Sequence, residues 1–232
     1  MKRVLLKLSG EALAQGTGEM YDASFVVKVA EAIKTCRDRG AEIALVVGAG
    51  NIWRGRQGND MDRTAADRMG MLATVMNSIY LKDALMRVGV KARVMSAVPM
   101  SPFAEGFSSD AAIAALKSGE VVIFGAGLGI PFLSTDTTGA VRAAEIGADA
   151  MLMAKNIDYI YTDDPRKNPD AKKLETVKAS EVLAMNLKAI DATATAFCLS
   201  NNMPIHVFGL KNPEDIVKAV FGEVSGTVVL PE

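Results

Sequence analysis

Three glycine-rich turns, each directly after a short apolar run, are the part of this sequence best suited to chemistry. Glycine is favoured where the backbone must take a positive φ or come close to a ligand. In open α/β sheets, ligands bind just beyond the carboxyl ends of the strands. The pattern therefore predicts a single site rich in phosphate contacts. The turns are Lys7-Leu8-Ser9-Gly10, Gly48-Ala49-Gly50-Asn51 and Gly125-Ala126-Gly127-Leu128-Gly129.

Two cations lie beside these turns. Lys7 follows the first apolar run, and a lysine held rigidly there can neutralise charge that grows on a transferring phosphoryl group. A lysine in a strand is more often a solvated edge residue or one half of a charge pair, so Lys7 alone is weak evidence. Arg54 follows the second turn and adds a guanidinium suited to binding phosphate. The turns and the cations together favour phosphoryl transfer.

The segment Ser134-Thr135-Asp136-Thr137-Thr138 opens a predicted helix. Its hydroxyl and N–H groups are suited to an anion, and Asp136 is suited to orienting a lysine. The same residues also form an ordinary helix cap with an acid in the first turn. Both interpretations remain open at this point.

Two common nucleotide-binding motifs are absent. The dinucleotide fingerprint requires a third glycine three residues after the second, and this chain has Trp53 and Ile130 at those positions. The Walker A pattern, with a lysine and then Ser or Thr after spaced glycines, is also missing. A nucleotide would therefore be bound by a different fold.

Short β-branched runs alternate with longer stretches of helical periodicity, which predicts an α/β fold with βαβ units and a largely parallel sheet. In the first helix, Phe25, Val29, Ile33 and Cys36 recur at helical spacing, and Gly40 ends it. Two prolines and several charges predict a surface loop at 162–169. The predicted strands are 4–8, 42–47, 91–95, 121–124, 150–153, 204–208 and 227–230, and the other predicted helices are about 62–88, 110–117, 136–146, 180–186, 191–201 and 213–221.

Composition and charge limit the possible partners. The chain has 232 residues, 50% hydrophobic and 23% charged, so it can bury a core as one domain. A net charge of −1 provides no broad cationic surface for nucleic acid or anionic lipid. The apolar run after Met1 is interrupted at Lys7 and is too short for a signal peptide, and no later segment could span a bilayer. We therefore expect a cytoplasmic protein without nucleic-acid or membrane partners.

The two cysteines, Cys36 and Cys198, are far apart and lack metal-ligand spacing. We expect both to be small buried apolar residues. No protein side chains are predicted to bind a metal ion.

Several segments together resemble the bacterial uridylate kinases of the amino-acid kinase family. The resemblance runs in order along the chain without a large gap. Single glycine turns are shared with acetylglutamate, glutamate and carbamate kinases, whereas the stretch from Asp67 to Asn77 is specific to the uridylate branch. Besides the first two glycine turns and Arg54, the segments are Asp67-Arg68-Met69-Gly70-Met71-Leu72-Ala73-Thr74-Val75-Met76-Asn77, Pro131-Phe132-Leu133-Ser134-Thr135-Asp136 and Tyr161-Thr162-Asp163-Asp164-Pro165.

This resemblance implies a three-layer αβα sandwich around a central, mainly parallel sheet. It implies a single domain over 1–232, with an acceptor-binding part at about 1–150 and an ATP-binding part at about 151–232. The implied reaction is transfer of the ATP γ-phosphoryl group to UMP, giving ADP and UDP for pyrimidine nucleotide biosynthesis. Mg²⁺ would arrive with ATP, since it prefers phosphate oxygens and water to an all-protein cage.

The resemblance also assigns roles to residues. Lys7 would neutralise transition-state charge, Asp136 would hold that lysine, and Arg54 completes the catalytic set. The UMP phosphate has a second pKa of about 6, so it is mostly a nucleophilic dianion near neutral pH and needs no general base. The single histidine, His206, is accordingly expected to be structural. The ATP-binding residues would be Lys7, Leu8, Ser9, Gly10, Gly50, Arg54, Lys155, Asn156, Tyr161 and Asp164, and the UMP-binding residues Ala49, Asp67, Leu128, Gly129, Ile130, Pro131, Phe132, Leu133, Ser134 and Thr135.

Three departures from the family pattern bear on regulation and selectivity. Ala49 stands where glycine is usual, and its methyl group would cost about 1–2 kcal/mol if that position needed a positive φ. Leu128 and Ile130 replace the common Thr and Asn, so main-chain atoms or shape would have to select uracil. Lys82 and Met86 replace an arginine and a histidine of GTP-activated relatives, whereas Arg93 matches. Feedback inhibition by UTP at the acceptor site is therefore the better-supported form of regulation.

The predicted helix at about 62–88, near whose start Asp67 lies, is more apolar than one buried stripe requires. With the resemblance, this surface implies subunit contacts in a homohexamer. Two other functions remain open: a sister kinase acting on a carboxylate, and a nucleotide-binding protein without turnover. The presence of both Lys7 and Asp136 argues against the second.

Overall fold

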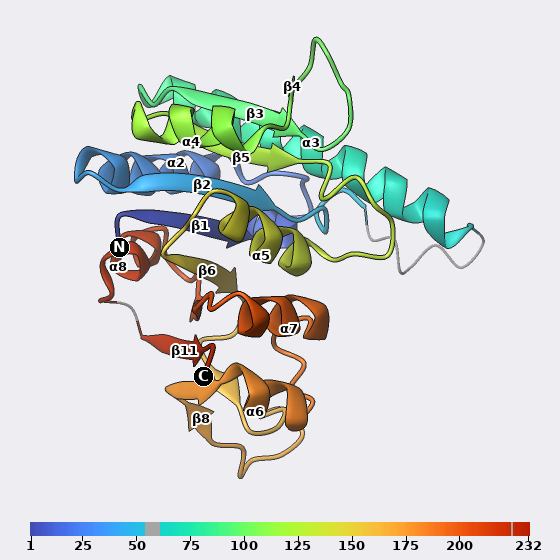
Figure 1. The fold of residues 1–232 in the computed structure, drawn as a ribbon, viewed down its shortest axis with the longest axis vertical. Helices are drawn as coiled ribbons and strands as arrows, with labels where there is room; N and C mark the ends of the chain where they lie inside the picture. The colour runs from blue at the N-terminus through green and yellow to red at the C-terminus, as the bar shows by residue number, and fades with distance from the viewer. Residues whose placement is uncertain (54–60, 224) are drawn as a thin grey trace.

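Among the residues that the structure describes, nine strands form one sheet with helices on both faces (Figure 1). This computed structural model describes residues 1–53, 61–223 and 225–232. The strand order is β4-β3-β5-β2-β1-β6-β10-β11-β9, and neighbouring strands are parallel except β10 and β11. The strands are β1 (Arg3–Leu8), β2 (Glu42–Val47), β3 (Ala92–Ser96), β4 (Glu105–Gly106), β5 (Val121–Gly125), β6 (Ala150–Lys155), β9 (Thr176–Lys178), β10 (Ile205–Gly209) and β11 (Gly226–Leu230).

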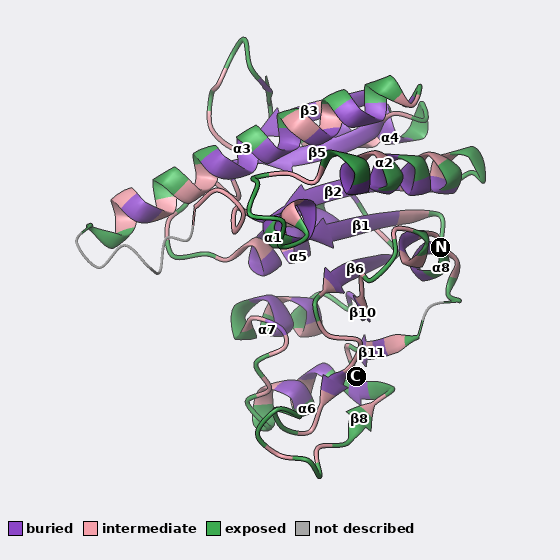
Figure 2. Cartoon of the chain, turned by 180° about the vertical axis from the view of Figure 1, so that it is seen from behind, coloured by how far each residue is buried: buried purple, intermediate pink, exposed green. Residues whose placement is uncertain are grey.

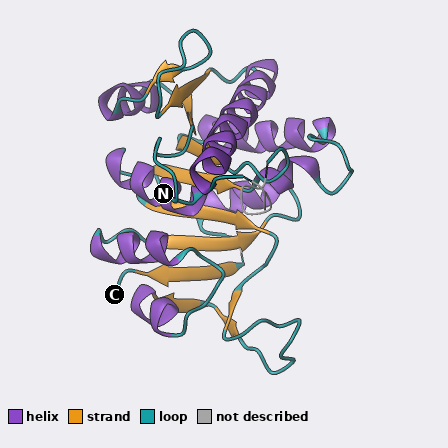
Figure 3. Ribbon diagram, turned by 90° about the vertical axis from the view of Figure 1, so that its right-hand side faces the viewer, coloured by secondary structure: helices purple, strands orange, loops and turns teal. Residues whose placement is uncertain are grey.

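The helices make up the two outer layers, on either side of the strands in Figure 3. A short antiparallel pair, β7 (Ile160–Tyr161) and β8 (Lys173–Leu174), forms a separate small sheet. Over the described ranges, no helix combines the length and the apolar content that crossing a bilayer requires. The helices are α1 (Gly10–Ala14), α2 (Ala23–Asp38), α3 (Arg63–Arg87), α4 (Ser109–Lys117), α5 (Thr135–Glu145), α6 (Ala179–Ala184), α7 (Ala192–Ser200) and α8 (Glu214–Phe221).

Each face of the sheet has its own hydrophobic core, and alternate residues of β1 point into the two cores. Leu6 packs into the core under α2, α3 and α8, whereas Leu5 packs into the core under α4, α5 and α7. Figure 2 shows the sheet as almost wholly buried. Because both faces are covered, the central strands are continuous apolar runs rather than alternating ones.

The predicted α/β fold is confirmed, and every predicted strand and helix is present with ends within two residues of the expected positions. The predicted loop at 162–169 lies between β7 and β8. Five short elements were not predicted from the sequence: α1, β4, β7, β8 and β9. These elements have two to five residues each and are too short to show a periodic pattern.

The three glycine turns meet at one edge of the sheet, and each uses its glycines differently. A Cβ on Gly10 would lie 2.5 Å from the carbonyl oxygen of Gly48, so glycine lets the first two turns touch. In the third turn, Ala126 and Gly127 have φ values of 61° and 60°. Ala49 is not among the described residues with positive φ, so its methyl group carries no backbone strain.

We expect Leu6→Ala to lower the free energy of unfolding by about 2–5 kcal/mol, because Leu6 is fully buried in the central strand and alanine leaves a cavity. Denaturant titration at equilibrium measures the change. Met20→Ala is the control, since 52% of Met20 is exposed; it should stay within about 0.5 kcal/mol of wild type. Equal losses in the two variants would contradict this description of the core.

Candidate active site

Asp136, in the first turn of α5, is held between two lysines from neighbouring strands. The Nζ atom of Lys7, on β1, lies 2.9 Å from Asp136 Oδ1, and the Nζ atom of Lys155, on β6, lies 2.8 Å from Oδ2. Lys7 and Asp136 are only 7% and 8% exposed. Both carboxylate oxygens are therefore used to hold ammonium groups in place.

Burial and charge act in opposite directions on this cluster. Burial alone would raise the pKa of Asp136, but the nearby charges of Lys7 and Lys155 outweigh it and hold that pKa below its usual value. Burial lowers the pKa of Lys155, and the Asp136 carboxylate partly opposes that shift. The carboxylate is thus kept ionised, which is the form that can hold two cations.

Asp191 joins the amino-terminal ends of α5 and α7. Its Oδ2 accepts hydrogen bonds from Ser134 Oγ at 2.7 Å and from Thr137 Oγ1 at 2.5 Å. Ser134 in turn caps α5 by accepting from the Thr137 N–H at 3.1 Å. The Asp191 N–H donates to Asp136 Oδ2 at 3.4 Å. From the sequence, Asp191 was expected only at the start of a helix, because the local sequence around a cap residue does not show what else its carboxylate binds.

A cavity of 420 Å³, which we call the lysine cavity, opens beside this cluster. Lys7 and Lys155 line it together with a third lysine, Lys188. Most of its wall comes from the ends of β1, β2 and β6 and the turns that follow them, and Thr135 of α5 and the segment before α7 complete it. The cavity thus includes residues of both the predicted acceptor-binding part and the predicted ATP-binding part. Of the predicted ATP-binding residues, Lys7, Ser9, Gly10, Gly50, Lys155 and Asn156 line it.

A second cavity of 320 Å³, the α3 cavity, lies between α3 and the loop that precedes α5. Ala49 and Thr135 line both cavities, so the two meet at these residues. Gly129 and Pro131 alternate in sequence with lining residues without lining the cavity themselves. Of the predicted UMP-binding residues, Ala49, Asp67, Leu128, Ile130, Phe132, Leu133, Ser134 and Thr135 line it.

Asp67 connects α3 to the loop before α5. Its Oδ2 accepts from the backbone N–H of Phe132 at 2.8 Å, and Arg63 Nε donates to the same oxygen at 2.9 Å. The Arg63 guanidinium lies 5.5 Å from the centre of the Phe132 ring. Phe132 has φ 71° and is 65% exposed. Asp67 was expected in the first turn of its helix, but α3 begins at Arg63 and has no acidic residue in that turn. From its place further along α3, Asp67 orients the loop that lines the cavity.

Three of the predicted ATP-binding residues that the structure describes line neither cavity. The side chain of Leu8 is buried in the core, so only its backbone is near the turns, where its carbonyl accepts from Gly48 N at 2.9 Å. Tyr161 donates to Asp158 at 2.9 Å, and Asp164 accepts from the Arg166 N–H at 3.0 Å. Neither residue lines the two cavities described above. Arg54 is outside the described residues.

The third glycine turn is attached to α3 by Thr74, whose role the sequence analysis missed. Thr74 Oγ1 accepts from the buried Ala126 N–H at 2.9 Å and donates to the Met71 carbonyl at 2.6 Å. A buried N–H without a partner would be costly, so this hydroxyl supports the positive φ of Ala126. Thr74 lies inside the stretch from Asp67 to Asn77 that carried the resemblance.

The described part of the chain contains no group of three His, Cys, Asp or Glu side chains that could hold a metal ion. Asp136 is already used by two lysines. Cys36 and Cys198 are buried free thiols, and burial raises the pKa of each to about 12. These thiols are therefore neutral at physiological pH.

We expect Asp136→Asn to lower the free energy of unfolding by about 3–5 kcal/mol at pH 7, because it leaves the buried ammonium group of Lys7 and the partly buried one of Lys155 without their shared carboxylate. The pKa of Asp136 is lower in the folded protein than in the unfolded chain. Its stabilising effect is therefore present above about pH 4 and is lost as the pH falls through the folded-state pKa. The difference from wild type should shrink in unfolding titrations at about pH 3.5, whereas exposed Asp170→Asn should show little difference at either pH. A constant difference would contradict this assignment.

Comparison with known proteins places this geometry in a group of kinases. Residues 2–209 match the amino acid kinase family. A UMP kinase from Bacillus anthracis is 36% identical, with a TM-score of 0.95, and the match covers 100% of this chain and 96% of that one. A UMP kinase from Ureaplasma parvum is 36% identical, with a TM-score of 0.93, and the match covers 99% and 98%. A uridylate kinase from Archaeoglobus fulgidus is 26% identical, with a TM-score of 0.78, and the match covers 99% and 100%.

The agreement extends over nearly the full length of the chain and includes the strands and turns from which both cavities are built. Because the family match and the structural matches agree over this length, the protein belongs to the amino acid kinase family.

Proposed function

We propose that this protein is a UMP kinase, which transfers the γ-phosphoryl group of ATP to UMP and releases ADP and UDP. The observation that carries the proposal is the meeting of the lysine cavity and the α3 cavity at Ala49 and Thr135, beside the Lys7–Asp136–Lys155 cluster. A substrate in each cavity would face the other beside the ammonium groups of this cluster. The full-length likeness to two bacterial UMP kinases supports the choice of acceptor.

The lysine cavity is the proposed donor site and takes ATP as its magnesium complex. In this substrate, Mg²⁺ binds phosphate oxygens and water. Lys7, Lys155 and Lys188 supply positive charge around the phosphate chain. Beyond the described cavity wall, Tyr161 stays a proposed contact of adenine and Asp164 a proposed contact of the base or the ribose. Arg54 stays a proposed phosphate contact.

The α3 cavity is the proposed acceptor site. A ribose hydroxyl of UMP can donate to Asp67, whose carboxylate has lone pairs beyond those used by Arg63 and Phe132. Leu128 and Ile130 offer uracil apolar contact and main-chain groups, so shape and backbone atoms would select the base. Ser134 and Thr135, beside the start of α5, lie where the acceptor phosphate would meet the donor.

Charge placement is the main task of this chain in the reaction. The UMP phosphate is mostly a dianion near neutral pH and attacks without a general base. The barrier comes largely from bringing two polyanions together in line. Lys7 and Lys155 are already fixed by Asp136, so they can neutralise charge on the transferring group without a rearrangement at that moment.

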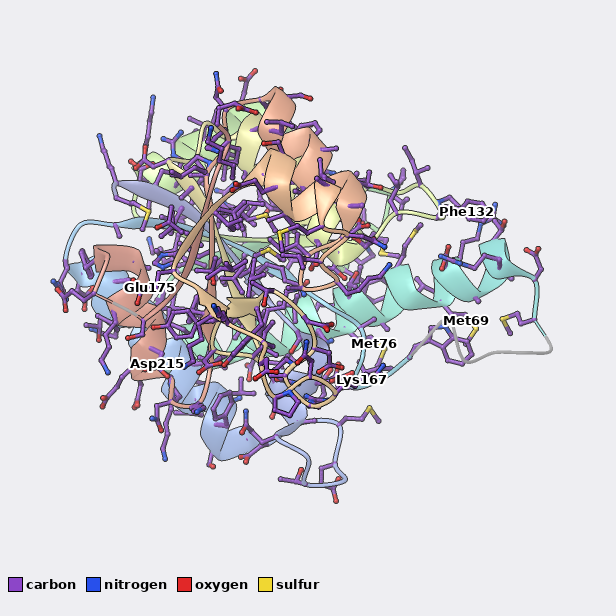
Figure 4. The ribbon with its side chains drawn as sticks, turned by 90° about the horizontal axis from the view of Figure 1, so that it is seen from below. Met69, Met76, Phe132, Lys167, Glu175 and Asp215 are labelled. Carbon is purple, nitrogen blue, oxygen red and sulfur yellow. The ribbon has the colours of Figure 1, made fainter. Side chains whose placement is uncertain are left out.

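The outer side of α3 supports the further proposal of a homohexamer. Met69, Leu72, Met76 and Ile79 form an apolar stripe along it and are 38–52% exposed. Figure 4 shows Met69 and Met76 along one side of α3, with Phe132 on the other. Contact with a second copy of the chain would remove this apolar surface from water. Inhibition by UTP at the acceptor site and a cytoplasmic location are also part of the proposal.

We expect ADP release from MgATP to be fastest with UMP when UMP, CMP, dUMP and acetylglutamate are compared in a coupled assay. Lys7→Met should lower kcat by about 10²–10³-fold while ATP still binds, because the ammonium acts mainly on transition-state charge. Lys34→Met, on the exposed side of α2, is the control and should match wild type. Faster turnover with CMP or with the carboxylate would overturn the choice of acceptor. ATP binding without turnover on any acceptor would favour a binding protein.

Asp67→Asn should raise KM for UMP by about tenfold or more, because a charge-assisted hydrogen bond to the ribose is weakened. KM for ATP should change little. Asp83→Asn is a matched control, since Asp83 also lies on α3 and also pairs with an arginine four residues away. Steady-state kinetics with each substrate varied in turn separates the two effects. If Asp67 proved dispensable, the proposed ribose contact would be wrong and a carboxylate acceptor would gain support.

A further inference from the structure

A reciprocal pair of asparagine side chains connects α3 to the second glycine turn. Asn77, fully buried on α3, donates through Nδ2 to the Gly48 carbonyl at 2.7 Å and to Asn51 Oδ1 at 2.8 Å. Asn51 donates through Nδ2 back to Asn77 Oδ1 at 3.1 Å and to the Met20 carbonyl at 2.8 Å. Three of these hydrogen bonds therefore hold the turn against α3, and the fourth holds it against the loop that contains Met20.

Only one orientation of the two side-chain amides satisfies these hydrogen bonds. The carbonyl oxygens of Gly48 and Met20 can only accept hydrogen bonds, so each must face an amide nitrogen. Once both Nδ2 atoms are placed in this way, the Oδ1 atom of each asparagine faces the other side chain. Replacing either amide with a carboxylate would put oxygen against oxygen. The pair thus depends on amide chemistry and not only on side-chain shape.

The turn that Asn77 holds is the one shared by the two cavities. Gly48, Ala49 and Gly50 line the lysine cavity, and Ala49 also lines the α3 cavity. A Cβ on Gly10 would lie 2.4 Å from Asn51 Oδ1, so the turn after β1 rests directly on the asparagine pair. A shift of the Asn77 side chain would therefore also move residues in the walls of both cavities.

We propose that Asn77 is a positioning residue for phosphoryl transfer. Through Gly48 and Asn51 it fixes the turn at which the donor and acceptor cavities meet, and so it sets the alignment of the two substrates. Asn77 touches neither cavity itself. The inference rests on the proposed function, because it concerns alignment of a donor and an acceptor in that site.

Ser78 provides a matched control on the same helix. It is as fully buried as Asn77, but its hydroxyl donates only within α3, to the Thr74 carbonyl at 2.7 Å. Ser78→Ala therefore removes a buried polar group without releasing the second glycine turn. If burial alone mattered, the variants at the two positions would behave alike.

The test compares wild type, Asn77→Asp and Ser78→Ala with MgATP and UMP. Misalignment by a fraction of an ångström lowers the rate more than it lowers binding, so we expect Asn77→Asp to reduce kcat by about 10–100-fold. Either KM should change by less than about threefold, as a change in alignment predicts. Ser78→Ala should keep the kcat of wild type. Thermal unfolding in parallel shows whether each variant is folded at the assay temperature.

A pH profile separates positioning from general damage. The carboxyl group that Asn77→Asp introduces can, once protonated, donate one hydrogen bond to the Gly48 carbonyl. The kcat of this variant, divided by that of wild type at the same pH, should therefore rise as the pH is lowered. Asn51→Asp tests the same pair from its solvent side and takes the place of Asn77→Asp if that variant does not fold. It too should lower kcat far more than KM.

Different results would overturn the proposed function and the positioning role of Asn77. If wild type makes no UDP from UMP, the proposed function is overturned and the inference falls with it. If wild type makes UDP but Asn77→Asp, or its substitute Asn51→Asp, keeps full kcat, only the inference is overturned. Equal losses of kcat in Asn77→Asp and Ser78→Ala would also overturn it.

Discussion

The site depends on one buried carboxylate that two lysines share. Taking ammonium groups out of water costs free energy unless a carboxylate of good geometry faces them. Asp136 meets that condition for Lys7 and Lys155 at once. The lysines come from β1 and β6, which are neighbours in the sheet, and Asp136 comes from the helix that packs across them. The cluster therefore forms only when β1, β6 and α5 are packed together. The two ammonium groups are then held in place before a substrate binds.

The helix α3 has two sides with different tasks. Its inner side carries Asp67, Thr74 and Asn77, which bond respectively to the loop before α5, the third glycine turn and the second glycine turn. Its outer side carries the apolar stripe that begins at Met69. Residues three or four positions apart share one side of a helix, so a single helix can serve a ligand site and a protein surface. In the proposed hexamer, contacts on the outer side would lie one helix diameter from the turns.

The glycines of the turns are required for different physical reasons. Gly10 allows two turns to touch, whereas Gly127 and Gly129 adopt positive φ. Alanine is tolerated at Ala49, where φ is not positive, and at Ala126, where it is. A left-handed conformation costs a non-glycine residue about 1–2 kcal/mol. The hydrogen bond from the Ala126 N–H to Thr74 helps to offset that cost.

The order and type of the main elements, the glycine turns and the pairing of Lys7 with Asp136 could be predicted from sequence. Strands buried on both faces are unbroken apolar runs, and helix caps are local signals. Only the tertiary structure decided that Lys155 shares Asp136, that Asp191 joins two helix ends and that Asn77 holds a turn. These contacts join residues distant in sequence, and strand order, not local pattern, brings such residues together. For Tyr161 and Asp164 the sequence motif alone predicted a place at the site. In the structure, their side chains line neither cavity.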